Sequence, residues 1–208
     1  EPVNLNHDAV WETDNVLMWH PTMAKYASKI LKESNDLRPS NIDWSKFPDE
    51  WHNITFEKTE TLANTNIHFV MNMSSPKYVM EQLILLIALP RQGINSLTII
   101  VPYLGPATHD RVDYPGQLAT VEPMLKILSS CIPGTKTGPP VLRIFDIHDL
   151  HERFYITDNI RIELMSAVPI LKKYLDDRFL SDGYVVAFPD EGAFKRFKYF
   201  FDGPKIIC

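Results

Sequence analysis

The side chains best suited to chemistry follow a short apolar segment, residues 141–145, which reads VLRIF and is mostly β-prone. It runs into a group of acids and histidines, Asp146, His148, Asp149 and His151. Carboxylates and imidazoles can bind metals and hydrogen-bond to phosphate groups. Open α/β sheets bind their ligands at the carboxyl ends of their strands. The segment therefore predicts a buried strand that delivers polar side chains to a site.

Two further segments repeat this pattern of an apolar run that ends in polar residues. YVVAF (184–188) continues into Pro189, Asp190, Glu191 and Gly192, and LTIIVPYLG (97–105) is followed by THDR. Because the carboxyl ends of parallel strands meet at one edge of a sheet, these junctions predict one shared cleft.

Each of these residues also has a structural interpretation. A lone histidine such as His148 is more often structural than a ligand. Asp190 can act as the N-cap of the helix that follows it, and this role is compatible with a role in binding. Lys195 and Arg196 are of a type that usually lies exposed on a helix.

Hydrophobic periodicity predicts strands that alternate with helices along the chain. The expected strands are 16–20, 42–47, 53–58, 67–72, 97–102, 141–145 and 184–188, and the expected helices are 22–34, 76–89, 117–131, 167–175 and 192–199. Thr22 and a serine before Pro76 are expected to cap two of the helices. The alternation predicts an α/β fold, a mostly parallel sheet with helices on both faces.

Composition excludes several functional classes. The 208 residues are 45% hydrophobic and carry a net charge of -5, so nucleic acid is not expected as a partner. No apolar run reaches the roughly 18 residues that span a bilayer, so no membrane partner is expected. The cysteines, Cys131 and Cys208, imply no disulfide framework, which fits a cytoplasmic location and leaves an organelle open.

The order of motifs along the chain resembles that of the phosphoribosyl pyrophosphate synthetases (ribose-phosphate diphosphokinases). The matching stretches read FPDEWHN, EQLILLIALPRQG, TIIVPYLG with THDR, FDIHDLHERFY and FPDEGAFKRF. The plant-type branch of that family is most similar, since its loops read FDIHALQERFYF and FPDDGAWKRF. The resemblance extends from Val16 to Cys208, and its two strand-loop motifs are specific when they occur together.

The resemblance implies a type I phosphoribosyltransferase-like fold with tandem domains, of which the second is incomplete here. The implied boundaries are an N-terminal extension at 1–15, an N-terminal domain at 16–150 and the first part of a C-terminal domain at 151–208. It also implies transfer of pyrophosphate from ATP to ribose 5-phosphate with Mg²⁺, in a homo-oligomer whose neighbouring subunits complete each adenine site.

Residue roles are implied by the same motifs. The residues implied for ATP binding are Phe47, Asp49, Arg111, His148 and His151. His148 and Asp190 are implied as metal ligands, and Asp190, Lys195 and Arg196 as catalytic residues. The chain departs from the family at Trp51, where the family has a glutamate, and at Thr108 and His109, where the main family has an Arg-Gln pair.

The family's ribose-phosphate loop, an acidic pair followed by small residues and GGT, does not occur in the sequence, and neither do the flexible catalytic Lys and Arg. We therefore expect a fragment of a longer protein that does not complete the reaction alone. Two alternatives stay open: a non-catalytic paralogue that regulates catalytic subunits, and a plain nucleotide- or sugar-phosphate-binding module.

Overall fold

The computed structural model describes residues 13–40, 42–56, 62–179 and 183–208. Most of the N-terminal extension expected at 1–15 therefore lies outside the described residues. The chain divides into two compact units, the first ending at Leu164 and the second running from Met165 to Cys208. The division falls later than the boundary expected after residue 150, because the segment up to Leu164 adds a strand to the first unit's sheet.

The first unit contains a 6-stranded sheet in the order β2-β1-β5-β6-β7-β8. The strands are β1 (Asn15–Trp19), β2 (Arg38–Pro39), β5 (Asn66–Val70), β6 (Ser96–Val101), β7 (Val141–Phe145) and β8 (Arg161–Met165). The pairs from β2 through β7 are all parallel. The expected α/β fold with a mostly parallel sheet is confirmed, and β8 is a strand that the sequence analysis did not predict.

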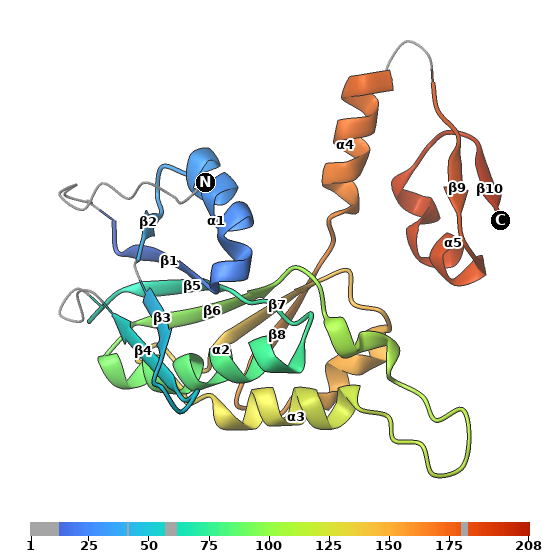
Figure 1. Ribbon diagram of the computed structural model, residues 1–208. Helices are drawn as coiled ribbons and strands as arrows, with labels where there is room; N and C mark the ends of the chain where they lie inside the picture. Colours follow the sequence, from blue (N-terminus) through green and yellow to red (C-terminus); the bar gives the residue numbers. More distant parts are fainter. Residues whose placement is uncertain (1–12, 41, 57–61, 180–182) are drawn as a thin grey trace. The chain divides into compact units, whose positions relative to one another are not determined.

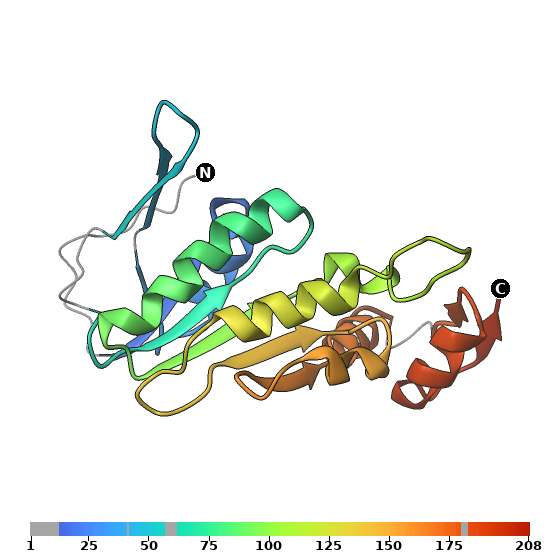
Figure 2. The same ribbon diagram turned by 90° about the horizontal axis from the view of Figure 1, so that it is seen from below.

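Helices cover both faces of this sheet, as expected. Helix α1 (Ala24–Glu33) lies on one face, and α2 (Pro76–Ala88) and α3 (Val121–Cys131) lie on the other (Figures 1 and 2). Side chains alternate along a strand, and β1 shows the result. Val16 and Met18 belong to the large core beneath α2 and α3, whereas Leu17 packs with the residues of α1.

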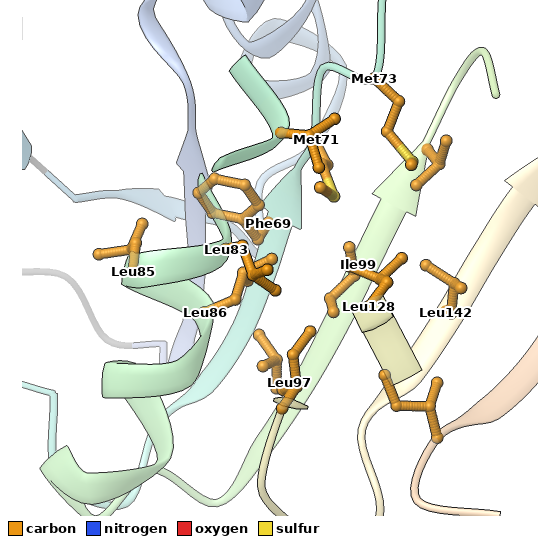
Figure 3. Packing of buried hydrophobic residues seen from close by; sticks show 14 of the residues in the cluster. Phe69, Met71, Met73, Leu83, Leu85, Leu86, Leu97, Ile99, Leu128 and Leu142 are labelled. Carbon is orange, nitrogen blue, oxygen red and sulfur yellow. The ribbon is translucent and has the colours of Figure 1, made fainter. Parts of the chain in front are cut away.

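The large core supplies most of the stabilising burial in the first unit. Leu83 and Leu86 point from α2 toward the strands that carry Phe69, Leu97 and Ile99 (Figure 3). All five side chains are buried, and burial of one such side chain contributes about 1.5–3 kcal/mol. The core therefore holds the strands in register and fixes the loops at their carboxyl ends.

A separate antiparallel hairpin joins this core through its stem. It consists of β3 (Ile42–Lys46) and β4 (His52–Phe56), with Trp44 paired opposite Ile54. Both of these residues pack against the large core, while the far end of the hairpin extends away from the sheet (Figure 2).

The helix starts correct two details of the sequence analysis. Before α1 lies a short 3-10 helix, η1 (Pro21–Met23), and its cap is His20, whose side chain accepts from the Thr22 backbone N–H. Thr22 is therefore not the cap. Ser75 precedes α2 as expected, but it makes no side-chain capping hydrogen bond to any part of the chain that the structure describes.

Helix α3 begins at Val121, later than the expected Gln117, so Pro123 lies in its first turn. Backbone N–H groups of a first turn have no partner within the helix, so a proline there removes no helical hydrogen bond. Pro123 therefore does not interrupt this described helix.

The second unit is small. It contains α4 (Val168–Phe179), β9 (Val186–Phe188), α5 (Glu191–Phe197), the 3-10 turn η6 (Lys198–Phe200) and β10 (Lys205–Ile207). β10 pairs in parallel with β9. Phe188 and Phe201 are its buried aromatic residues among those described, and their rings meet at 6.3 Å.

No helix in the described part of the chain is long and apolar enough to cross a membrane.

Candidate functional site

The loops after β5 and β6 approach each other backbone to backbone. The 3-10 turn η4 (Gly105–Thr108) follows β6. A Cβ atom placed on Gly105 would lie 2.0 Å from the Met73 carbonyl oxygen, far inside contact distance. Glycine is therefore required at this position, and the close approach fixes where the chain leaves β6 toward residues 108–111.

The loop after β7 begins in an unusual backbone conformation. Asp146 has a φ of 45°, which non-glycine residues seldom adopt, although aspartate is among the types that tolerate it. The turn directs the next residues away from the strand, and His148 lies exposed beyond it. The conformation of Asp146 therefore sets the direction in which the loop leaves β7.

A capping box then fixes the following 3-10 helix, η5 (Leu150–Tyr155). The Asp149 carboxylate accepts from the His151 N–H at 2.8 Å, and the Glu152 carboxylate accepts from the Asp149 N–H at 3.3 Å. The His151 ring is exposed and meets the rings of Phe154 and Tyr155 edge-on. Backbone and ring contacts thus hold His151 in place, and both His148 and His151 are exposed to solvent.

Arg111 lies in the long loop between β6 and α3. Its Nε is 3.4 Å from the Asp110 carboxylate, and 69% of its side chain is exposed. The loop closes where the His109 carbonyl accepts from the Thr120 N–H at 3.0 Å. Arg111 and His148 therefore follow neighbouring parallel strands at the same edge of the sheet.

Phe47 and Asp49 lie in the turn of the β3–β4 hairpin. The Phe47 N–H donates to the Trp51 carbonyl at 2.8 Å, and the Asp49 carboxylate accepts from the Trp51 N–H at 3.3 Å. Phe47 is 51% exposed and Trp51 is 71% exposed. Phe47 is thus a surface residue, so an aromatic face is available for a planar partner.

The predicted catalytic residues lie in the second unit. Asp190 caps α5, where its carboxylate accepts from the Ala193 N–H at 2.8 Å. Lys195 forms an exposed ion pair with Glu191 at 3.1 Å. The Arg196 guanidinium lies 4.8 Å from the centre of the Phe197 ring. The capping interpretation of Asp190 is therefore confirmed.

The two predicted metal ligands, His148 and Asp190, come from different units. Among the described residues, no group of three or more His, Cys, Asp and Glu side chains is gathered closely enough to hold a metal. Mg²⁺ is often held by one or two protein groups together with waters and substrate phosphates, without a full protein cage. Asp190 supplies a carboxylate of the kind that Mg²⁺ prefers, whereas an imidazole such as His148 is an unusual ligand for it.

The sequence analysis missed a buried polar network near the carboxyl end of β1. His20 Nε2 lies 3.0 Å from a Glu81 carboxylate oxygen, and His20 Nδ1 lies 2.7 Å from the Thr22 hydroxyl. Burial lowers the pKa of His20, and the hydrogen bond to Glu81 opposes this shift. His20 and Glu81 lie 61 residues apart in sequence, so no local spacing connects them.

The amino-acid sequence matches a known protein family and several of its members. Residues 17–131 match the family model described as the N-terminal domain of ribose phosphate pyrophosphokinase. Ribose-phosphate pyrophosphokinase 3, chloroplastic, of Oryza sativa subsp. japonica is 36% identical over 96% of this chain and 49% of its own length. Ribose-phosphate pyrophosphokinase 3, mitochondrial, of Spinacia oleracea is 35% identical over 92% of this chain and 47% of its own length.

The fold has a solved counterpart. The phosphoribosylpyrophosphate synthetase of Mycobacterium smegmatis superposes with a TM-score of 0.70 at 19% identity, covering 93% of this chain and 63% of that one. The chain spans about half the length of the curated plant relatives that it matches. Both sequence relatives are plant proteins, which confirms the resemblance to the plant-type branch. The chain belongs to the ribose-phosphate pyrophosphokinase family.

Proposed function

We propose that the full-length protein is a ribose-phosphate pyrophosphokinase, which transfers the pyrophosphoryl group of ATP to the anomeric hydroxyl of ribose 5-phosphate. The products are phosphoribosyl pyrophosphate and AMP. One observation carries the proposal: the loop with Arg111, which lies within the family match, follows the carboxyl end of a parallel strand, and the loop with His148 follows the neighbouring parallel strand of the same sheet. Ligands of open α/β sheets bind at that edge.

On the ATP side, we assign the adenine to the hairpin turn. The exposed Phe47 ring offers a stacking face, and the Asp49 carboxylate can accept from an exocyclic amine. Arg111, His148 and His151 are all exposed donors that can bind phosphate oxygens.

On the ribose side, the chain supplies an acid and two cations from one short helix. Asp190 is assigned to the metal and the ribose, and Gly192 beside it leaves space for a ligand to approach. Lys195 and Arg196 can offset phosphate charge. The Lys195–Glu191 pair is exposed, so breaking it to meet a ligand costs little.

Magnesium, when bound, would neutralise charge on the phosphates of ATP and help to align the transferring group. His148 and Asp190 are the residues of this chain proposed to hold it, together with ATP oxygens.

We further propose a homo-oligomer in the cytoplasm or an organelle, with ATP and ribose 5-phosphate as its small-molecule partners. The exposed aromatic residues of the hairpin turn support an interface. The rice and spinach relatives are named as chloroplastic and mitochondrial, which supports an organelle. Cell fractionation of the tagged full-length protein distinguishes the compartments.

The decisive experiment incubates the purified full-length protein with ATP, ribose 5-phosphate and Mg²⁺. Formation of AMP and phosphoribosyl pyrophosphate in equal amounts is expected, with neither product formed when ribose 5-phosphate is omitted. ATP binding without AMP formation would refute the enzyme and favour a regulatory paralogue. ADP as the nucleotide product would refute pyrophosphoryl transfer.

A further inference from the structure

The strand order of the first unit reverses direction between β1 and β5. From β1 the chain moves to β2 on one side, and it then returns to place β5 on the other side. In open α/β sheets the carboxyl ends of the strands at such a reversal are a preferred location for ligands. Here the residues that follow β1 and β5 instead join one internal hydrogen-bond network that includes His20 and Asn72.

Hydrogen bonds connect the residues that follow β1 with those that follow β5. The Asn72 side-chain amide donates to the Thr22 hydroxyl at 2.7 Å. Gln82, fully buried, clamps the Asn72 backbone by accepting from its N–H at 2.7 Å and donating to its carbonyl at 2.7 Å. These contacts tie the end of β5 to the end of β1.

A single assignment of protons satisfies the whole chain of hydrogen bonds. The Thr22 backbone N–H faces His20 Nδ1 at 3.4 Å, so Nδ1 accepts. The Thr22 hydroxyl, which accepts from Asn72, then donates its own proton to the same nitrogen. The His20 proton therefore lies on Nε2 and is donated to Glu81 at 3.0 Å. This makes His20 neutral, in agreement with its lowered pKa.

The network continues into the β3–β4 hairpin. The His20 ring contacts Trp44 of β3 at 5.0 Å, edge-on, and Tyr78 of α2 at 5.1 Å. The second oxygen of the Glu81 carboxylate lies 3.8 Å from the Lys46 ammonium group. Lys46 is the last residue of β3 and directly precedes Phe47. Glu81 thus joins the helix, the sheet and the base of the hairpin turn.

We propose that Glu81 and His20 are positioning residues for the nucleotide. Glu81 binds His20 through one carboxylate oxygen and places the other 3.8 Å from the Lys46 ammonium group, which also pairs with Glu50 at 3.5 Å. In this way the pair sets the direction in which the hairpin presents Phe47 and Asp49 to the nucleotide at the subunit interface. The proposal rests on the proposed function, because it assumes that this turn binds the adenine of ATP.

Two substitutions in the full-length protein separate the contacts of this network. Glu81→Gln keeps an acceptor for His20 but turns an uncharged group toward Lys46. His20→Phe keeps a ring between Trp44 and Tyr78 but leaves a Glu81 oxygen without its donor. Glu122→Gln is the matched control, because Glu122 forms an exposed ion pair with Lys126 on α3.

Hydrogen exchange measured by mass spectrometry reports the hairpin directly. In both network variants the amides of residues 42–56 should exchange about tenfold faster, since His20→Phe removes the buried hydrogen bond to Glu81 and Glu81→Gln removes the charge that faces Lys46. The amides of β6 should keep their wild-type rates. Hairpin rates equal to those of Glu122→Gln, or faster exchange throughout the sheet, would overturn the positioning role.

Nucleotide affinity gives the second measurement. The dissociation constant of Mg-ATP should rise about tenfold in Glu81→Gln, with the KM for ribose 5-phosphate unchanged. Lys46→Met should cost less when Glu81→Gln is already present, because the two residues act through one contact. An ATP affinity that matches the control, or fully additive effects, would contradict the proposal.

The failure of the proposed function has a different signature. A wild-type protein that binds no ATP would refute the adenine assignment itself. The exchange rates of the hairpin would then decide alone whether Glu81 and His20 position it.

Discussion

Asp190 combines a structural contact with the chemistry proposed for it. Its carboxylate caps α5 through the Ala193 N–H, and the same group is assigned to the metal and the ribose. Asparagine is about as good an N-cap as aspartate but carries no charge. The two roles can therefore be separated at this one residue.

We expect Asp190→Asn in the full-length protein to keep the wild-type melting temperature and to lose AMP formation. Asp190→Ala should lose activity as well and also destabilise α5 by about 1 kcal/mol, because the cap is removed. Thermal unfolding and product assays on both variants provide the test. Wild-type turnover in a folded Asp190→Asn protein would remove the catalytic assignment.

His148→Ala should weaken the binding of Mg-ATP and leave the fold intact, since the ring is exposed beyond the turn at Asp146. Titration of ATP at several magnesium concentrations measures the effect. A variant that unfolds while its folded fraction binds ATP normally would favour a structural role for the histidine.

The pH dependence of stability should carry a contribution from His20. Its pKa lies below the ordinary value of 6.5 because burial outweighs the hydrogen bond to Glu81, and Lys77 on α2 lowers it further. Below pH 6.5 the unfolded chain binds more protons at this position than the folded chain, so stability falls with pH. This stabilisation is fully present above pH 6.5. It is lost progressively as the pH falls from 6.5 through the lower pKa of the folded state.

Urea unfolding of the wild type and of His20→Phe between about pH 5 and pH 8 measures this contribution. The difference between the two free energies of unfolding should shrink as the pH falls. A difference that is constant across this range would show that His20 keeps its ordinary pKa in the folded protein. Glu81 and Lys46 face the same network, so Glu81→Gln should alter the slope too.

At the scale of elements, the loops depend on how closely the strand ends approach one another. The contact between Gly105 and the Met73 carbonyl joins the loops after β5 and β6, and the network around His20 joins the ends of β1 and β5. The carboxyl edge of the sheet is therefore braced at two neighbouring positions. This bracing lets exposed loops carry polar side chains in fixed places.

Gly105→Ala should destabilise the first unit by about 2 kcal/mol or more, because the added methyl group overlaps the Met73 carbonyl oxygen. Relief of this overlap requires the backbone of one of the two loops to move. Gly134→Ala is the matched control, since its nearest neighbour would lie at 3.7 Å. Denaturant unfolding compares the two. Equal stabilities would show that the loops can move apart without cost.

At the scale of the whole molecule, the assigned site residues are divided between the two units. Phe47, Arg111 and His148 belong to the first unit, and Asp190 and Lys195 to the second. Under the proposed function, the hairpin turn is the part of the first unit that would meet a neighbouring subunit.

Trp51→Glu should weaken assembly and ATP binding together, because it places a charge on an exposed apolar turn that we expect at the interface near the neighbour's residues 110–113. Trp51→Phe keeps an aromatic group and should stay assembled. Size-exclusion chromatography with light scattering reports the oligomer. A strictly monomeric wild type at tens of micromolar that binds ATP would contradict this prediction.

Local sequence determined much of the fold and the motifs. β7 forms at 141–145 as predicted, because an uninterrupted apolar run followed by acids needs no distant partner to define it. The parallel sheet followed from the alternation of strand and helix patterns. The roles assigned to Asp190 and His148 followed from motifs that are contiguous in the chain, although their chemistry stays a prediction.

The tertiary structure decided what depends on contacts between distant residues. β8 has the mixed sequence RIELM, and its place beside β7 makes it a strand that periodicity did not predict. That strand also moves the division of the chain to Leu164. Among the described residues, the His20 side chain has only Thr22 as a local partner, and it received no role from its sequence. Folding brings it to Glu81 and Trp44, because parallel strands place residues from remote segments at a single edge.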